Sequence, residues 1–237
     1  MKKKDISDFK LTYEQLKDIK QFRLIMMPAR VLFALAFFAL ICGGPRQFFS
    51  ELPGPLFVLL FSIYLVSERA FRTLAVSGPG RDERSIGYLW MTFGSAYTLA
   101  LLDFYWLRPH WALLEWNWIW AAAGTGLFAV GQTIRVVSIR ALGRFFTVTV
   151  RLHPEHNLIK EGIYKRIRHP AYLGLLIGMT GYVTLFASVI GYALLLFLAL
   201  PAMIFRIRVE ERVLIEKFGD EYRDYCRQAK RLVPFVF

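Results

Sequence analysis

Cysteine is scarce in this chain, and the two cysteines present do not form a recognisable cysteine-based site. Cys42 and Cys226 stand far apart and make no C-x-x-C pair, whereas zinc sites and disulfide frameworks need several cysteines at characteristic spacings. His153 and His156 form an H-x-x-H pair, but no further cluster of ligating residues accompanies them. We therefore expect ordinary free thiols and no metal.

Acidic residues are also few, with 18 Asp and Glu against 30 Lys and Arg and a formal net charge of +12. A nucleic-acid-binding surface gathers such an excess of cations into a patch or groove. In this chain the Lys and Arg residues instead flank apolar segments, which is typical of membrane proteins oriented by their charges. The composition therefore favours membrane lipids as partners and excludes nucleic acid.

Long apolar runs are abundant, because 56% of the residues are hydrophobic and the mean hydropathy is +0.40. These values indicate an integral membrane protein. We expect an interfacial amphipathic helix over residues 1–23, with no cleavable signal, and four transmembrane helices within residues 24–140. The four expected helices are Leu24–Cys42, Pro53–Leu74, Tyr88–Leu107 and Trp116–Val137.

The longest uncharged run, Ala171–Phe205, predicts two more transmembrane helices. As a single helix it would be roughly 52 Å long at about 1.5 Å per residue, well beyond a hydrocarbon core of about 30 Å. It must therefore fold back, and Ser188–Gly191 is the most plausible turn. The fold class that we expect is all-α, a polytopic membrane bundle of about six helices followed by a C-terminal cytoplasmic helix.

The distribution of positive charge supports this count independently. If the N-terminus is cytoplasmic, all Lys and Arg residues except Arg46 and Arg108 fall in cytoplasmic segments, as the positive-inside rule requires. Those segments are residues 1–30, 67–87, 135–170 and 206–237. Both termini are therefore expected on the cytoplasmic side, together with the polar stretch before Ala171 and the Glu210–Glu211 pair.

That polar stretch, Gly162–Gly174, reads GIYKRIRHPAYLG and opens directly into the uncharged run. Pro170 is well suited to the first turn of a helix. Arg168, His169 and the amides of that first turn would then form a receptor for a carboxylate or another anion. The juxtaposition predicts a polar site at a membrane face, within a catalytic region over residues 141–237.

The same residues carry a family resemblance over roughly Leu142 to the C-terminus. The pattern resembles the isoprenylcysteine carboxyl methyltransferase and phospholipid methyltransferase superfamily. Its elements are His156-Asn157-Leu158, Gly162, Tyr164, Arg168-His169-Pro170, Tyr172, Gly174, Glu210-Glu211, Phe218-Gly219, Tyr222, Tyr225 and Pro234. The resemblance implies a membrane-embedded methyltransferase that uses S-adenosyl-L-methionine from a cytoplasm-facing pocket, while a lipophilic acceptor enters from the bilayer. No obligate protein partner is inferred.

The resemblance and the chemistry together assign roles to these positions. The expected cofactor-binding residues are His156, Leu158, Gly162, Tyr164, Arg168, His169, Pro170, Tyr172, Leu173, Gly174, Glu210 and Glu211. Glu210 or Glu211 would accept from the cofactor ammonium. Arg206 and Glu210 are the expected catalytic residues, with Arg206 holding an acceptor carboxylate; the alternative is that these two form a surface ion pair four residues apart.

The sequence leaves other functions open. The favoured acceptor is the carboxylate of an isoprenylcysteine-type substrate, and the alternative acceptor is a phospholipid amine. Membrane sterol reductases that use NADPH share a similar His-Pro-Tyr element, although this chain has Leu175 after Gly174 where an acidic residue is common in that group. A membrane scaffold without catalysis is a third hypothesis.

Overall fold

The computed structural model describes residues 36–72, 84–107, 114–146 and 157–232, and every regular element in these ranges is helical apart from one isolated bridge between Ile167 and Lys230. Longer helices alternate with short 3-10 and π segments. In chain order the elements are α2 (Pro45–Ser50), α3 (Pro53–Arg72), α4 (Arg84–Leu102), the π-helix η2 (Asp103–Leu107), α6 (Trp118–Leu142), the 3-10 helices η3 (Gly143–Phe145) and η4 (Gly162–Lys165), α7 (Pro170–Leu185), α8 (Val189–Leu194), the π-helix η5 (Leu195–Ala199), α9 (Leu200–Phe218) and α10 (Asp220–Gln228).

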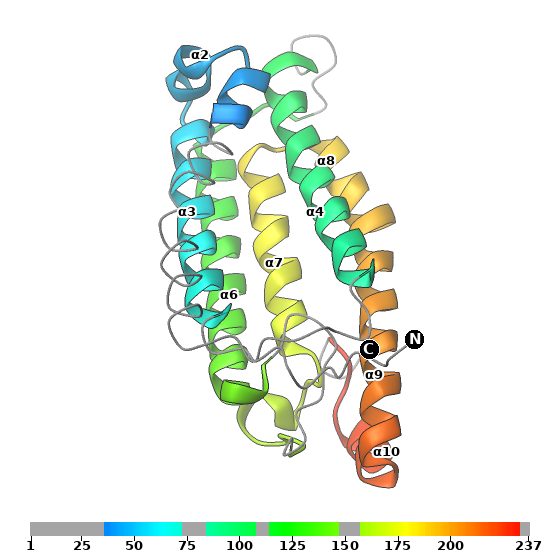
Figure 1. Cartoon of the computed structure of the whole chain (residues 1–237). Helices are drawn as coiled ribbons and strands as arrows, with labels where there is room; N and C mark the ends of the chain where they lie inside the picture. The colour runs from blue at the N-terminus through cyan, green and yellow to red at the C-terminus, as the bar shows by residue number, and fades with distance from the viewer. Residues whose placement is uncertain (1–35, 73–83, 108–113, 147–156, 233–237) are drawn as a thin grey trace, which may run out of the picture.

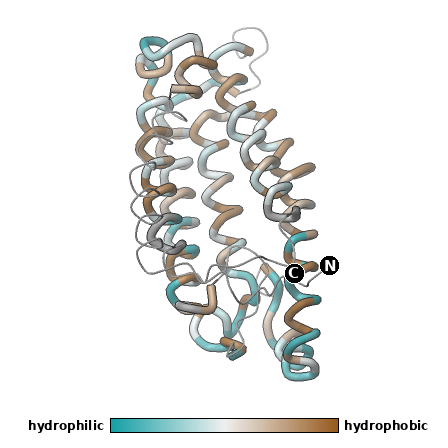
Figure 2. The backbone as a smooth tube through the Cα atoms, in the orientation of Figure 1, coloured by the Kyte–Doolittle hydropathy of each residue, from teal (hydrophilic) through white to brown (hydrophobic). Residues whose placement is uncertain are grey.

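The longer helices run roughly along one axis (Figure 1). α3 and α6 lie on one side, α7 lies in the middle, and α4, α8 and α9 lie on the other side. α2 closes one end of the bundle and α10 lies at the opposite end. Hydrophilic residues gather at the α10 end, where the chain also leads into α7, whereas the helices between the ends are largely hydrophobic (Figure 2).

The expected all-α class is confirmed, and three expected helices are observed. α3 is described as far as Arg72, where the described residues stop, α4 begins four residues before the expected Tyr88, and α6 continues five residues past the expected Val137. The interfacial helix expected over residues 1–23 lies outside the described residues, as does most of the helix expected over Leu24–Cys42. Within the described ranges, two helices, Trp118–Leu142 and Val189–Phe218, are long and apolar enough to cross a membrane, and Pro53–Glu68 and Pro170–Leu185 are shorter apolar helices.

The expected hairpin is also present, and its turn lies between α7 and α8. Ala187 has a positive φ of 48°, a conformation that is uncommon for a residue with a Cβ. The Ser188 hydroxyl accepts from the Gly191 amide and so caps α8, and it donates to the buried Asp103 carboxylate over 2.5 Å. This contact gives a charged residue within the α4–η2 helix a partner and ties that helix to the turn.

α8, η5 and α9 form one continuous helix of 30 residues. Its length is about 45 Å at 1.5 Å per residue, so about a third of it extends beyond a hydrocarbon core of about 30 Å. The charged part begins at Arg206, where the uncharged run ends. We therefore place Glu210 and Glu211 beyond the hydrocarbon core.

Glycines bring α6 and α7 into backbone contact. A Cβ on Gly131 would lie 2.6 Å from the Gly174 carbonyl oxygen and closer still to the Gly178 amide, and a Cβ on Gly174 would lie 2.6 Å from the Arg135 amide. Gly124 meets Gly181 and Leu185 in the same way. The two helices are therefore antiparallel, and their separation is set by residues without side chains.

This contact makes Gly131→Ala a destabilising change. The methyl group must push α6 away from α7, and such overpacking typically costs about 1–3 kcal/mol. Gly126 is the matched control on the same helix, because a Cβ there meets nothing within 4 Å; Gly126→Ala should be neutral or stabilising by up to about 1 kcal/mol. Unfolding of the two variants in detergent measures the difference, and equal stabilities would contradict the close approach.

Candidate functional site

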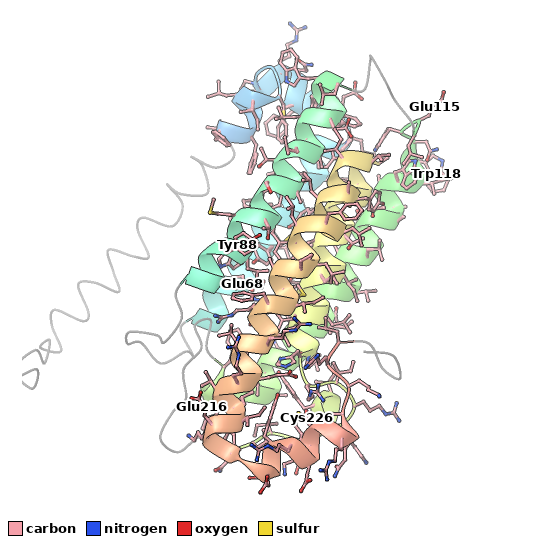
Figure 3. All side chains as sticks on the ribbon, turned by 90° about the vertical axis from the view of Figure 1, so that its right-hand side faces the viewer. Glu68, Tyr88, Glu115, Trp118, Glu216 and Cys226 are labelled. Carbon is pink, nitrogen blue, oxygen red and sulfur yellow. The ribbon has the colours of Figure 1, made fainter. Side chains whose placement is uncertain are left out.

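The polar end of the bundle is organised around the Glu211 carboxylate, which is only 6% exposed. Its Oε1 lies 3.0 Å from Arg168 Nε and 3.3 Å from His169 Nε2, and its Oε2 lies 2.9 Å from Arg231 Nε. Nitrogen-bearing side chains gather at this end, near Glu216 and Cys226 and opposite Glu115 and Trp118 (Figure 3). One carboxylate thus joins α9, the start of α7 and the C-terminal segment.

These neighbours keep Glu211 ionised. Burial alone would raise the pKa of the carboxyl group. The hydrogen bond and charge of His169, together with the charges of Arg168 and Arg231, outweigh burial and lower the pKa of Glu211 from 4.5 to about 2. Glu211 is therefore a fixed anion at neutral pH.

Arg168 also binds the C-terminal segment. Its Nη1 donates to the carbonyl oxygens of Cys226 and Ala229, over 2.8 and 2.7 Å. The backbones meet as well, since the Arg168 amide donates to Lys230 O and the His169 amide donates to Arg231 O. The segment after α10 therefore clamps the residues that lead into α7.

The start of α7 differs in one respect from the expected anion receptor. Pro170 is the first residue of the helix, as expected. However, the His169 amide is paired with Arg231, and the amides of Tyr172 and Leu173 donate to His169 O. The expectation of free amides was therefore wrong for His169 and Tyr172, because the C-terminal segment and the tight first turn use these two groups; the Leu173 amide makes an ordinary helical hydrogen bond.

Tyr172 joins the two residues expected to be catalytic. Its hydroxyl donates to Glu210 Oε2 over 2.8 Å and accepts from Arg206 Nε over 3.2 Å. Arg206 is 1% exposed, so it does not lie at the surface, as the alternative of a surface ion pair with Glu210 required. A buried guanidinium, a phenol and a half-buried carboxylate thus form one connected group.

Comparisons with known proteins identify the family of this chain. Residues 124–216 match the sequence model of the isoprenylcysteine carboxyl methyltransferase (ICMT) family. Protein-S-isoprenylcysteine O-methyltransferase B of Arabidopsis thaliana is 30% identical over 142 residues, which cover 59% of this chain and 68% of that protein. The chain belongs to the isoprenylcysteine carboxyl methyltransferase family.

Another relative and a solved structure from the ICMT family are also similar to this chain. A probable protein-S-isoprenylcysteine O-methyltransferase of Oryza sativa is 32% identical over 128 residues, 52% of this chain and 65% of that protein. The chain thus spans about two thirds of the length of such relatives. The structure of a eukaryotic intramembrane Ras methyltransferase, ICMT, matches with a TM-score of 0.57 at 22% identity and covers 81% of this chain and 67% of that one. The resemblance inferred from the motifs is confirmed, and the ICMT membrane fold is shared.

Several family-motif residues pack the helices around the site. Tyr164 is buried, its hydroxyl donates to Ser138 O on α6, and its carbonyl accepts from the Tyr225 hydroxyl. Burial raises the pKa of the phenol in both Tyr164 and Tyr225, which therefore stay neutral donors. Gly174 permits the contact with α6.

The other residues expected to bind the cofactor lie in or near η4 and on α7. Gly162 opens η4 with a φ of 58°, a conformation that favours glycine. Leu158 packs against the cluster around Tyr222 and Tyr225, and Leu173 is half-buried on α7. His156 lies outside the described residues.

Three residues of the polar network in this ICMT-family chain were not predicted: Arg231, Glu68 and Arg135. Glu68 falls in the segment 67–87 that was expected to be cytoplasmic, but it is 5% exposed and its Oε1 lies 2.6 Å from Arg135 Nε. A signal was present for Arg135, because a charged residue inside an expected transmembrane helix usually has a partner and a function. Arg231 offered no comparable signal, since basic residues are frequent in the C-terminal segment.

Proposed function

We propose that this protein is a methyltransferase that uses S-adenosyl-L-methionine and methylates the carboxylate of an isoprenylcysteine-type lipid acceptor. The observation that carries the proposal is the connected group of Arg206, Tyr172 and Glu210 at the end of an apolar bundle. Arg206 offers a cation for the acceptor and Glu210 offers an anion for the cofactor, and the Tyr172 hydroxyl binds both side chains. The names of the ICMT relatives support the same chemistry.

Arg206 is the proposed acceptor clamp. Its position directly follows the uncharged run, which ends at Phe205, so the guanidinium lies where a lipid headgroup would meet the polar end of the bundle. A guanidinium binds a carboxylate through two parallel hydrogen bonds. A carboxylate needs no general base, and the protein contributes chiefly alignment for an in-line displacement.

Glu210 is the proposed acceptor for the cofactor ammonium. Glu211 is less suited to that role, because both of its oxygens already accept from Arg168, His169 or Arg231. When bound, S-adenosyl-L-methionine supplies a methyl group on a sulfonium. We keep the expected cofactor contacts of Tyr172, Leu173 and the motif residues around them as part of this proposal.

The alternatives fit the charges of the site less well. A phospholipid amine is cationic when protonated, and a buried guanidinium beside it would be repulsive. A membrane scaffold gives no reason to keep a buried cation that is joined to Glu210 through a phenol. A direct measurement of which cofactor binds tests the sterol-reductase alternative.

Calorimetric titration of the purified protein with S-adenosylhomocysteine and, separately, with NADPH tests the cofactor assignment. We expect binding of S-adenosylhomocysteine alone. Binding of NADPH without S-adenosylhomocysteine would assign the chain to reductase chemistry, and binding of neither would favour the scaffold.

For the topology, we propose six transmembrane helices with both termini, and the active site, on the cytoplasmic side. The proposal is supported by the Lys and Arg residues outside the apolar segments, of which only Arg46 and Arg108 fall on the other side. The long apolar helices fit a multi-pass protein.

Cysteine labelling tests this topology. In a background with Cys42→Ala and Cys226→Ser, cysteine at Arg46 or Arg108 should react only from the non-cytoplasmic side. Cysteine at Arg227, which is exposed on α10, is the control that should react from the cytoplasmic side. Labelling of all three from one side would refute the six-helix arrangement.

A further inference from the structure

A buried ion pair links α3 to α6 at a distance in sequence from the site motifs. Glu68 on α3 and Arg135 on α6 are 5% and 7% exposed, and Arg135 Nε donates to Glu68 Oε1 over 2.6 Å. Glu68 lies between the two ends of the bundle (Figure 3). Burying two charges is costly, and an ion pair is not retained merely because it adds stability. The pair therefore calls for a role other than holding two helices together.

Arg135 makes a second contact, and this contact reaches α7. Its Nη1 donates to the Ala171 carbonyl oxygen over 3.2 Å. The backbones of the two helices also approach closely beside this contact, since a Cβ on Gly174 would lie 2.6 Å from Arg135 N. Arg135 therefore fixes both the spacing and the rotation of the first turn of α7.

That first turn carries Tyr172, the residue next to Ala171. The Tyr172 hydroxyl joins Glu210 to Arg206, and its ring lies 5.9 Å from the His169 ring. A small shift of the turn would change both hydrogen bonds together. Contacts run without a break from Glu68 through Arg135, Ala171 and Tyr172 to the group proposed to align acceptor and cofactor.

We propose that Glu68 and Arg135 are positioning residues for the methyl-transfer site. Glu68 orients the Arg135 guanidinium, and Arg135 holds the Ala171 carbonyl so that Tyr172 stays between Arg206 and Glu210. The proposal rests on the proposed function, in which Arg206 is the acceptor clamp and Glu210 accepts from the cofactor ammonium.

The same two helices provide a matched control. Gln132 on α6 donates to the Ser67 hydroxyl on α3, beside the ion pair in sequence, and among the described hydrogen bonds its side chain joins only these two helices. A variant at Gln132 removes a polar α3–α6 contact without touching α7. It therefore separates loss of helix packing from loss of positioning.

Hydrogen exchange in the cofactor-free protein is the first test. Arg135→Lys keeps the charge, but a compact ammonium cannot hold Glu68 and the Ala171 carbonyl in the same fork geometry. We expect exchange in the peptide covering residues 170–178 to be at least about threefold faster than in the parent. Gln132→Ala should leave that peptide unchanged, and equal effects of the two variants would overturn the proposal.

A double-mutant cycle with Tyr172→Phe is the second test. Misplacement of a reacting group by about 1 Å can cost about a hundredfold in rate, so Arg135→Lys should lower kcat roughly tenfold to a hundredfold while the Kd of S-adenosylhomocysteine stays within about threefold. In the Tyr172→Phe background the same change should cost less than about threefold further. Additive losses would show that Arg135 does not act through Tyr172.

Three further outcomes have defined consequences for the proposal. If the parent neither binds S-adenosylhomocysteine nor transfers a methyl group, the proposed function fails, and hydrogen exchange alone still decides the positioning of α7. If Arg135→Lys cannot be purified, Glu68→Gln enters the same exchange experiment and cycle. If neither variant yields folded protein, the ion pair is structural and the proposal is overturned.

Discussion

Arg206→Lys should lower turnover about a hundredfold or more, while the affinity for S-adenosylhomocysteine stays within about threefold of the parent. Arg206 is 1% exposed and its Nε binds the Tyr172 hydroxyl, so the guanidinium is held at the end of the uncharged run, in the position proposed for contact with an acceptor carboxylate. Lysine keeps the charge but cannot reproduce a bidentate contact. A hundredfold loss corresponds to about 2.7 kcal/mol of transition-state stabilisation.

Arg208→Lys is the control for this variant, because Arg208 is exposed on the same helix two residues further on. It should retain nearly parental turnover. Turnover assays on both variants, with S-adenosylhomocysteine titrations on the same preparations, make the comparison. Near-parental turnover of Arg206→Lys would reject the acceptor clamp and leave Arg206 a packing residue.

Glu211→Ala should destabilise the protein by about 3–5 kcal/mol. Glu211 is buried between the guanidinium groups of Arg168 and Arg231, and removing one partner of a buried ion pair leaves the other charge uncompensated. Cofactor binding should be lost together with the docking of the C-terminal segment. From the motif alone one would expect loss of binding in an otherwise intact protein, but the ion cluster makes instability the first effect.

Thermal unfolding in detergent measures this loss, and Glu216→Ala is its control. Glu216 is exposed on the same helix, so its removal should cost at most about 1 kcal/mol.

Glu211 also makes the stability of the protein depend on pH, since the pKa of its carboxyl group is lowered from 4.5 to about 2. The stabilisation is present above about pH 4.5 and disappears as the pH falls toward 2. Unfolding of Glu211→Gln should lack that component, and identical acid profiles would contradict the ion cluster.

The apolar helices were predictable because their signal is local. Runs of uncharged residues and their flanking charges gave α3, α4, α6 and the hairpin within a few residues. The fold-back of the uncharged run followed from its length, since 35 residues exceed one membrane crossing. The π-helices η2 and η5 were not predicted, because they depend on packing between helices and not on a periodic pattern.

The sequence singled out residues at the polar end of the bundle, but it did not predict the contacts between them. Arg206, Glu210 and Tyr172 were singled out separately, yet only the fold brings the phenol between the other two. Arg168 and Glu211 were expected to meet the cofactor, and the structure pairs them with each other. Contacts between residues far apart in sequence leave no local pattern, so the roles of Arg135 and Arg231 required the structure.

Methyl transfer to a defined acceptor tests the central claim most directly. The purified protein is incubated with S-adenosyl-L-methionine carrying a labelled methyl group and with a short isoprenylcysteine whose amine is blocked and whose carboxylate is free. We predict a labelled product that releases methanol in base, as a methyl ester does, and no product from the same compound with its carboxylate amidated. Incorporation of label into a phospholipid amine but not into the isoprenylcysteine would contradict the account.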